Sequence, residues 1–251
     1  MIISERYGLI FIKSSKCAGT SLELFLDPLC GPDDVVTPFF HPERGQRPRN
    51  FEGDFDPEPE RQYLRGQPTT SFGGSTPSLD QTDADVLAGR RFYEAMPAWQ
   101  LRCRIGWERF GEFFSFAIER NPWDKVLSRL DHWNSVNTHG LTITVDELLD
   151  HLEANWLSPL FQLAPVNFPR YADPLTGEVL VSRLCKFDRL NAELAGIFRQ
   201  LDVPFQGSLP VLAKAGYRDG TRHYRQRLTE AQGRRIGRLF SAEIDLMGFE
   251  W

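Results

Sequence analysis

Residues 9–26 read LIFIKSSKCAGTSLELFL, and this stretch decides the fold that the sequence predicts. It opens with four apolar residues, continues with small and polar residues from 13 to 21, and closes with helix-forming residues rich in leucine. This order predicts a buried strand, a tight loop and a helix. The main-chain N–H groups of such a loop and the positive N-terminal end of the helix converge on one point, where they hold phosphate groups.

The side chains of the loop also suit an anion. Lys16 supplies a mobile positive charge, and Thr20 and Ser21 supply hydroxyl donors in the first turn of the predicted helix. Small residues at Ala18 and Gly19 let a ligand approach the main chain closely. The candidate phosphate contacts are Lys16, Cys17, Ala18, Gly19, Thr20 and Ser21.

The loop differs from the Walker A sequence G-x-x-x-x-G-K-[ST], in which a lysine directly follows a glycine. Here Lys16 precedes Gly19 by three positions. A strand-to-helix turn that holds no ligand is the other interpretation that this segment, taken alone, leaves open.

Length and composition favour one large α/β domain. The chain has 251 residues, of which 41% are hydrophobic and 12% aromatic, enough for a packed core. No segment approaches the ~18 uncharged apolar residues of a membrane span. The N-terminus lacks the apolar region of a signal peptide, so a cytoplasmic protein is expected. A net charge of −5 and a pI of about 5.6 disfavour a general nucleic-acid binder.

The cysteines are scattered, with no C-x-x-C pair and no histidine at metal-ligand spacing. They are expected to be free thiols in a reducing compartment, and no metal site is predicted. Cys17 lies in the loop beside Lys16, where it is either a reactive thiolate or a small residue that fills the loop. The second interpretation is favoured.

Further elements follow from apolar patterning and from turn residues. A buried parallel strand is predicted for residues 113–118, and Pro122 after Asn121 marks the start of a helix. Residues 42–81 are rich in Pro, Gly and charged residues, and are either a mobile insertion that folds over a substrate or a disordered surface segment. The remaining predictions are a strand at 35–37, helices at 84–105 (broken at Pro97), 146–157, 190–201 and 229–247 (capped by Thr229), and an edge hairpin at 168–181.

Besides the loop at residues 16–21, a second anion-binding site, or anion grip, is predicted after strand 113–118. Arg120 lies just past the carboxyl end of that strand, and Ser128 follows eight residues later, about two turns into the helix. Carboxyl ends of strands in an α/β sheet line the ligand crevice, so both loops are expected to open onto one cleft. An arginine fork and a hydroxyl suit a phosphate. Two separate grips indicate a ligand with two separated phosphate groups.

These motifs resemble those of the PAPS-dependent sulfotransferases, specifically the membrane-free bacterial members of the carbohydrate-type family. The first loop of that family reads K-T-x-K-T-A-G-T-S-[IL]-E, and residues 13–23 here read KSSKCAGTSLE. The second motif, R-N-P-W-D-[RK]-[VL]-x-S, is matched by residues 120–128, RNPWDKVLS. Further matches are residues 30–34, 173–177, 214–218, 223–224 and 246–251. The resemblance covers nearly the whole chain apart from the 42–81 insertion.

The resemblance implies a P-loop-like central parallel sheet flanked by helices, a three-layer sandwich, in one sulfotransferase domain over residues 1–251. It implies that the donor is 3′-phosphoadenosine 5′-phosphosulfate (PAPS), that the product is PAP, and that the acceptor is a hydroxyl of a small molecule or saccharide. The 5′-phosphosulfate is expected over residues 16–21, and the 3′-phosphate against Arg120 and Ser128. Lys214 and Arg218 are expected to close over the 3′-phosphate. Lys16 is expected to neutralise charge on the leaving oxygen during in-line transfer, which requires no metal.

One position departs from the family. Relatives carry a histidine that resembles a general base in an N-H-M-x-A-like stretch, and Ala95 falls at that place here. Three interpretations are open: Glu94 serves as the base, His41 reaches in, or the base is absent and the protein binds the donor with slow turnover. Glu94 is the favoured base. The competing functions are therefore a non-catalytic nucleotide-binding module and a P-loop nucleotide kinase, although the G-K-[ST] of a kinase is missing.

Overall fold

The computed structural model describes residues 1–39, 45–65, 90–136, 142–154, 165–209 and 223–251. At its centre lies a five-stranded sheet in the order β3-β1-β2-β4-β5. The strands are β1 (Ile2–Ser4), β2 (Leu9–Ile12), β3 (Val35–Val36), β4 (Phe114–Glu119) and β5 (Arg183–Lys186). The strands predicted at 9–12, 35–37 and 113–118 are thus confirmed as β2, β3 and β4.

The sheet is mixed, so the prediction of a parallel sheet holds only for one part of it. Strands β2, β4 and β5 run parallel, whereas β1 is antiparallel to both β2 and β3. Only the four residues 5–8 connect β1 to β2, and Gly8 adopts a left-handed φ of 59° there. So short a connection can join antiparallel strands but cannot make the crossover that parallel neighbours need.

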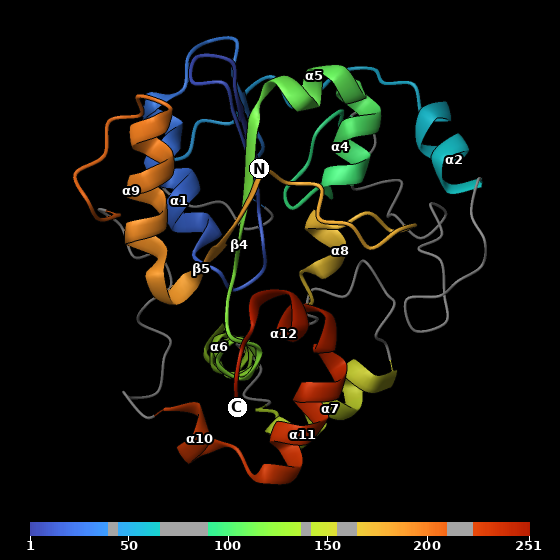
Figure 1. The fold of residues 1–251 in the computed structure, drawn as a ribbon, viewed down its shortest axis with the longest axis vertical. Helices are drawn as coiled ribbons and strands as arrows, with labels where there is room; N and C mark the ends of the chain where they lie inside the picture. The colour runs from blue at the N-terminus through green and yellow to red at the C-terminus, as the bar shows by residue number, and fades with distance from the viewer. Residues whose placement is uncertain (40–44, 66–89, 137–141, 155–164, 210–222) are drawn as a thin grey trace.

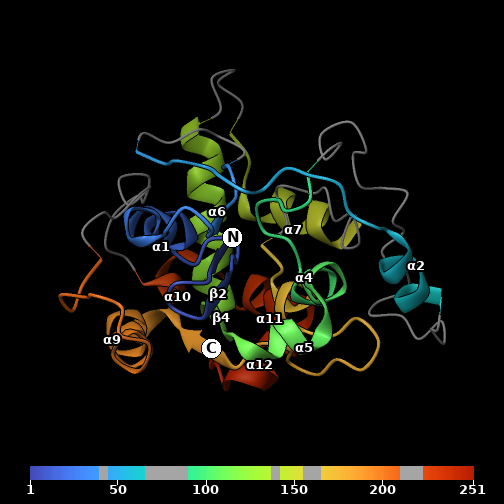
Figure 2. The ribbon, with the colours of Figure 1, turned by 90° about the horizontal axis from the view of Figure 1, so that it is seen from above.

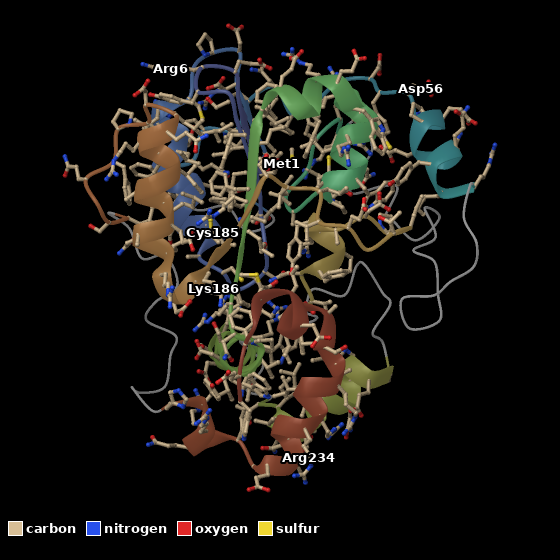
Figure 3. All side chains as sticks on the ribbon, in the orientation of Figure 1. Met1, Arg6, Asp56, Cys185, Lys186 and Arg234 are labelled. Carbon is tan, nitrogen blue, oxygen red and sulfur yellow. The ribbon has the colours of Figure 1, made fainter. Side chains whose placement is uncertain are left out.

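Helices flank both faces of the sheet (Figure 1). One face packs against α1 (Gly19–Leu26) and α9 (Leu190–Gln200), and the other against α4 (Ala98–Ile105), α5 (Trp107–Glu112) and α8 (Phe168–Tyr171). Alternate strand residues supply the two cores, as the twofold period of a strand requires: Phe11, Phe116 and Ile118 face α1 and α9, while Ile10, Ile12 and Ala117 face the other side. Figure 3 shows side chains filling the space on both sides of the strands.

A third core lies beyond the carboxyl ends of β2, β4 and β5 (Figure 1). It contains Trp123, Leu127 and Phe240, all buried. Its helices are α6 (Pro122–Val136), α7 (Val145–Ala154), α10 (Tyr224–Arg227), α11 (Glu230–Leu239) and α12 (Ser241–Met247). This helical layer supports the end of the sheet at which the two predicted anion grips lie.

The structure changes several predicted elements. The segment 168–181 is no edge hairpin of the sheet: it begins as helix α8, and a single bridge joins Ala172 to Val179. Strand β5, whose short pattern RLCK is half polar, forms the edge instead. Residues 90–97 are not helical, and α4 begins only after Pro97. The helix predicted at 229–247 is two helices that meet at Phe240, although Thr229 does cap α11 through a capping box.

Part of the polar segment 42–81 packs against the domain. Residues 45–65 are described and end in α2 (Glu58–Arg65), which lies at the periphery beyond α4 (Figure 2). Glu60 of α2 is buried and accepts hydrogen bonds from Gln100 (2.7 Å) and from Arg104. Two short 3-10 turns, Asp27–Leu29 and Phe187–Arg189, complete the elements. No helix within the described ranges is long and apolar enough to cross a membrane.

Candidate functional site

The loop between β2 and α1 has an unusual main chain. Lys16 has a φ of 60° and Ala18, the residue before α1, a φ of 59°, and both values lie in the left-handed region that favours glycine. Each such residue costs about 1–3 kcal/mol and persists only where its surroundings fix it. Left-handed residues turn successive N–H groups toward one side of a loop, which is how anion-binding concavities form. Residue 17, between them, is buried.

Lys13, at the start of this loop, packs across it. Its buried ammonium lies 2.5 Å from a carboxylate oxygen of Glu23 on α1 and also pairs with Glu94. Its aliphatic stem crosses Gly19, where an added Cβ would lie 2.7 Å from Lys13 Cγ. The Lys13 side chain therefore occupies the space on the Cβ side of Gly19.

Arg120 reaches the loop from the end of β4. Its Nη1 donates to the main-chain carbonyl of Lys16 at 3.1 Å, while Nε and Nη2 contact Asp124 at 2.7 and 2.6 Å. The guanidinium also lies on the ring of Phe187, 4.4 Å from its centroid. Because a guanidinium carries five N–H donors and these contacts use three, two N–H remain without a partner among the described residues (5 − 3 = 2).

Asn167 binds the loop through Ser15. Its side-chain Oδ1 accepts from Ser15 N at 2.7 Å, and its Nδ2 lies 3.2 Å from Ser15 O, so one amide binds both main-chain groups of one residue. Nδ2 is also within hydrogen-bond distance of Cys17 Sγ (3.4 Å) and Glu119 Oε1 (3.3 Å). No local pattern in the sequence indicates this contact, because 152 positions separate Asn167 from Ser15.

A buried charge cluster continues below Asn167. Lys125 and Glu119 are both inaccessible and pair at 2.7 Å, and Glu243 of α12 lies 3.5 Å from the same ammonium. Tyr171 donates to the second oxygen of Glu119 at 2.9 Å. Burial raises the pKa of the Glu243 carboxyl, although Lys125 acts in the opposite direction. The motif residue Lys125 therefore belongs to the support of the loop.

Cys17 fills the loop and is not activated. Its side chain is fully buried, and its Sγ lies 3.2 Å from Ser15 O. Burial, followed by the carboxylate of Glu119, raises the pKa of this thiol far above its ordinary value. All four cysteines are free thiols, as predicted.

The other predicted site residues are only partly brought together. Ser128 is half-buried on α6, and next to it stands Arg129. Its buried Nε has no acceptor among the described residues, and burial lowers the pKa of Arg129 to about 10. Sequence reasoning passed over Arg129. Thr20 is half-buried and Ser21 buried on the first turn of α1. Lys214, Arg218 and His41 lie outside the described residues.

Further observations concern ligands. The buried hydroxyl of Ser14, in the loop, has no hydrogen-bond partner among the described residues. Ala95, the residue at the histidine position, has a φ of 60°, and the preceding Glu94 is held by Lys13. Within the described ranges no cluster of three His, Cys, Asp or Glu residues could hold a metal ion.

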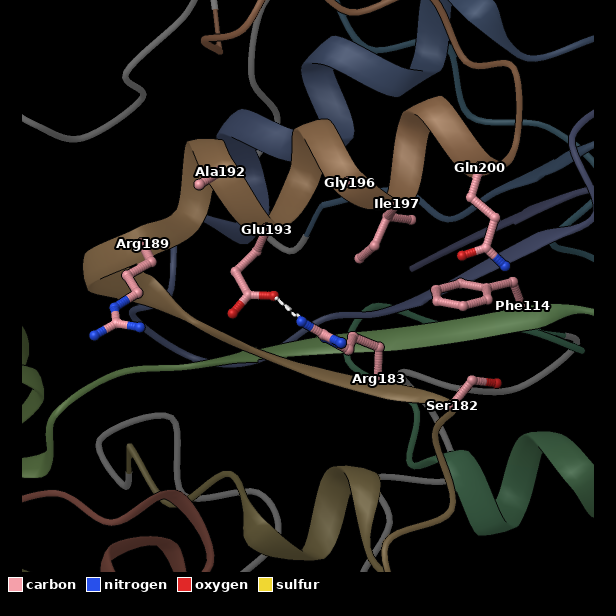
Figure 4. A pocket seen from close by; sticks show the side chains of 9 residues that line it. All are labelled: Phe114, Ser182, Arg183, Arg189, Ala192, Glu193, Gly196, Ile197 and Gln200. Atoms are coloured by element: carbon pink, nitrogen blue, oxygen red, sulfur yellow. Dashed lines mark hydrogen bonds and ion pairs between the residues drawn. The ribbon is translucent and has the colours of Figure 1, made fainter.

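A surface hollow of about 480 Å³ lies elsewhere, between α9 and strand β5 (Figure 4). Phe114, at the start of β4, lines it together with the exposed ion pair of Arg183 and Glu193 at 2.7 Å. No candidate residue from the sequence lines this hollow, so we do not assign it to the predicted site.

Comparisons with known proteins give one relative of unassigned role. No family model matches the chain, and no solved structure matches it. The chain is similar to an uncharacterized protein of Archaeoglobus fulgidus, with 30% identity over 110 residues. The match takes in 43% of this chain and 84% of that protein. The comparison therefore identifies a relative but indicates no activity.

Proposed function

This chain belongs to the same family as the uncharacterized protein of A. fulgidus, and from the residues around its loop we propose that it is a PAPS-dependent sulfotransferase. The proposed reaction moves the sulfuryl group of PAPS to a hydroxyl of an acceptor, which we take to be a carbohydrate. The P-loop-like character of the domain and a cytoplasmic location are parts of the same proposal.

The observation that carries the proposal is the contact between Arg120 Nη1 and the carbonyl of Lys16 at 3.1 Å. It joins the two anion-binding motifs at the carboxyl ends of the adjacent parallel strands β2 and β4. The donor set also fits a ligand with two acidic groups. Counting only the described residues as partners, the loop offers an unpaired buried Ser14 hydroxyl, Arg120 retains two N–H groups, and Arg129 stands beside Ser128.

In the proposed reaction the acceptor oxygen forms a bond to sulfur while the bond from sulfur to the bridging phosphate oxygen breaks. The electron pair of the broken bond stays on that oxygen, which leaves as part of PAP. Lys16 and the loop N–H groups stabilise its growing negative charge, and they do so best because they are already oriented. The acceptor proton passes to a base, for which Glu94 remains our candidate. The ammonium of Lys13 competes for the carboxylate lone pairs that a base would use.

Ala95 favours a second function: a protein that binds PAPS but transfers its sulfuryl group slowly. A general base contributes about 10²–10⁴-fold in rate, and the alanine at this position supplies none. A nucleotide kinase is less well supported, because the loop sequence KSSKCAGTS has no glycine directly before a lysine.

The deciding experiment is a thermal-shift and calorimetric titration with PAP, AMP and Mg-ATP. A ligand that binds only the folded chain raises its stability by mass action. We expect a clear preference for PAP over AMP, because only PAP carries the 3′-phosphate, and loss of that preference in Arg120→Ala. A preference for Mg-ATP, or failure to bind any of the three, would refute the proposal.

A further inference from the structure

Arg170 is a half-buried arginine with a single hydrogen-bond acceptor among the described residues. It lies on α8 and its Nη1 donates to the carbonyl of Ala95 at 2.6 Å. Its Nε is buried, with no hydrogen-bond acceptor in the part of the chain that the structure describes. Across the described parts of the chain, no carboxylate lies within ion-pair distance, and the Ala95 carbonyl is the single acceptor for five N–H donors.

A buried guanidinium without a counter-charge is costly, and two other arginines of this chain avoid that cost by pairing with an acid. Arg104 pairs with Glu60, and Arg120 pairs with Asp124. For Arg170 the nearby acid is Glu94, which Lys13 already engages. Burial lowers the pKa of Arg170, while Tyr93, Glu94 and Cys17 act in the opposite direction without pairing with it. The described residues therefore leave a surplus positive charge at this place, which a bound anion would balance.

The location of Arg170 places this charge beside the proposed reaction centre. Asn167, three residues earlier, binds the loop at Ser15, and Arg170 itself binds the residue at the histidine position. Helix α8 lies on the opposite side of β4 from α9 (Figure 1). Arg120 packs on Phe187, which leads into α9, so Arg120 and Arg170 flank the loop from different sides. The residues proposed to bind the donor include Arg120 on one side of the loop, and Arg170 lies on the other side.

We propose that Arg170 binds an anionic group of the acceptor, a carboxylate or a sulfate or phosphate ester, and so selects acidic saccharides over neutral ones. The inference rests on the proposed sulfotransferase function. Arg170 is half-buried as a residue, so part of it is open to a ligand, and a planar guanidinium with several open N–H groups can bind two oxygens of one anion.

The test measures anion binding on the full chain saturated with PAP, so that the donor grips are filled. The probes are sodium glucuronate, inorganic sulfate and, as the neutral counterpart, methyl β-glucoside, each titrated by thermal shift and calorimetry. We expect the two anions to bind the wild type and the glucoside not to bind. Arg170→Gln should weaken anion binding at least tenfold, and Arg170→Lys should weaken it less.

Arg102→Gln is the matched control. Arg102 is also half-buried, and its Nε has no partner within the described ranges, but its guanidinium lies over Trp107, 3.8 Å from the ring centroid. Anion binding should be unchanged in this variant, and the affinity for PAP should stay within twofold in all variants. Thermal unfolding of each variant without ligand separates loss of binding from loss of fold.

Three results would overturn the inference. The first is that neither anion binds the wild type, or that both bind Arg170→Gln as tightly. The second is that Arg170→Gln weakens PAPS relative to PAP, since Arg170 would then hold the transferring sulfuryl group of the donor. The third is equal binding of glucuronate and glucoside. If PAP itself fails to bind, the sulfotransferase proposal falls, and the same anion titrations without PAP still decide whether Arg170 is an anion site.

Discussion

Arg120 Nη1 donates to the main-chain carbonyl of Lys16 at 3.1 Å, and so ties the end of β4 to the loop after β2 across 104 positions of the chain. Lys16 is held in the left-handed region, at a φ of 60°. The contact therefore stabilises a main-chain conformation that costs energy, and it connects the two motifs that we propose to bind anions. The loop and the arginine are one unit in this fold.

Arg120→Lys tests that unit. Lysine keeps the positive charge but cannot reach Asp124 with two nitrogens and the Lys16 carbonyl with a third. We expect the affinity for PAP to fall at least tenfold, measured by calorimetry. Arg49→Lys is the control, because Arg49 also pairs with a buried acid, Asp27, at 2.7 Å. Equal effects of the two substitutions on PAP affinity would mean that Arg120 has no special relation to the loop.

Asn167→Ala removes the amide that binds both main-chain groups of Ser15. Leaving these partly buried groups unpaired should lower the free energy of unfolding by about 1–3 kcal/mol in urea titrations, and should also weaken PAP binding. Asn134→Ala is the matched control, since Asn134 binds N and O of Ile143 at 2.9 and 3.0 Å in the same manner on α6. It should reduce stability similarly and leave PAP affinity intact. A change in PAP affinity with Asn134→Ala but not with Asn167→Ala would contradict the assignment.

These contacts show which features of the loop could be predicted from the sequence and which could not. The strand, loop and helix at 9–26 were predictable because apolar runs and turn residues act locally. The meeting of the loop with Arg120 was predictable because carboxyl ends of parallel strands share one edge. The partner of Ser15 was not, because Asn167 comes from a distant segment with no pattern of its own. The path of Lys13 across Gly19 was not predictable either, since only the folded chain shows what lies on the Cβ side of that residue.

Lys125→Met should destabilise the protein in a pH-dependent way. Removing the ammonium leaves the carboxylates of Glu119 and Glu243 buried together, which costs about 3–5 kcal/mol when both are charged. The folded-state pKa of Glu243 is raised above its ordinary 4.5, so its stabilising contribution is complete below that pH and is lost as pH rises through the folded pKa. Without Lys125 that pKa rises further. We therefore expect a smaller loss of stability at pH 5 than at pH 8 in denaturant titrations.

The double variant Lys125→Met with Glu243→Gln provides the control for this pH dependence. It removes one of the two buried carboxylates that lack a counter-charge, so the difference between the losses of stability at pH 5 and pH 8 should shrink. If the single variant loses the same free energy of unfolding at both pH values, the cluster does not titrate as described.

Gly19→Ala tests the packing of Lys13 across the loop. The new methyl group would lie 2.7 Å from Lys13 Cγ, so the Lys13 stem and its ion pairs must shift. Overpacking of this kind costs about 1–3 kcal/mol, and urea titration should show it. Gly111→Ala on α5 is the control, because nothing lies within 4 Å of its added Cβ. That substitution should leave stability unchanged or raise it, as helix propensity favours alanine. If Gly19→Ala leaves the free energy of unfolding unchanged, the Lys13 side chain can move away from residue 19 without cost.

Ala95→His asks whether the missing histidine limits turnover. Ala95 has a φ of 60°, and histidine is among the residues that tolerate this region better than most, so the main chain can accept the change. A general base here should raise sulfuryl transfer from PAPS by about 10²–10⁴-fold, measured as PAP release with acidic saccharide acceptors. Ala95→Gln, which has a side chain of similar size but no basic group, should give no such gain. PAP affinity should stay within twofold in both variants, because residue 95 lies on the flank of Arg170 rather than of Arg120. Unchanged turnover in Ala95→His would show that residue 95 does not face the acceptor hydroxyl, and Glu94 would then be the carboxylate to substitute next.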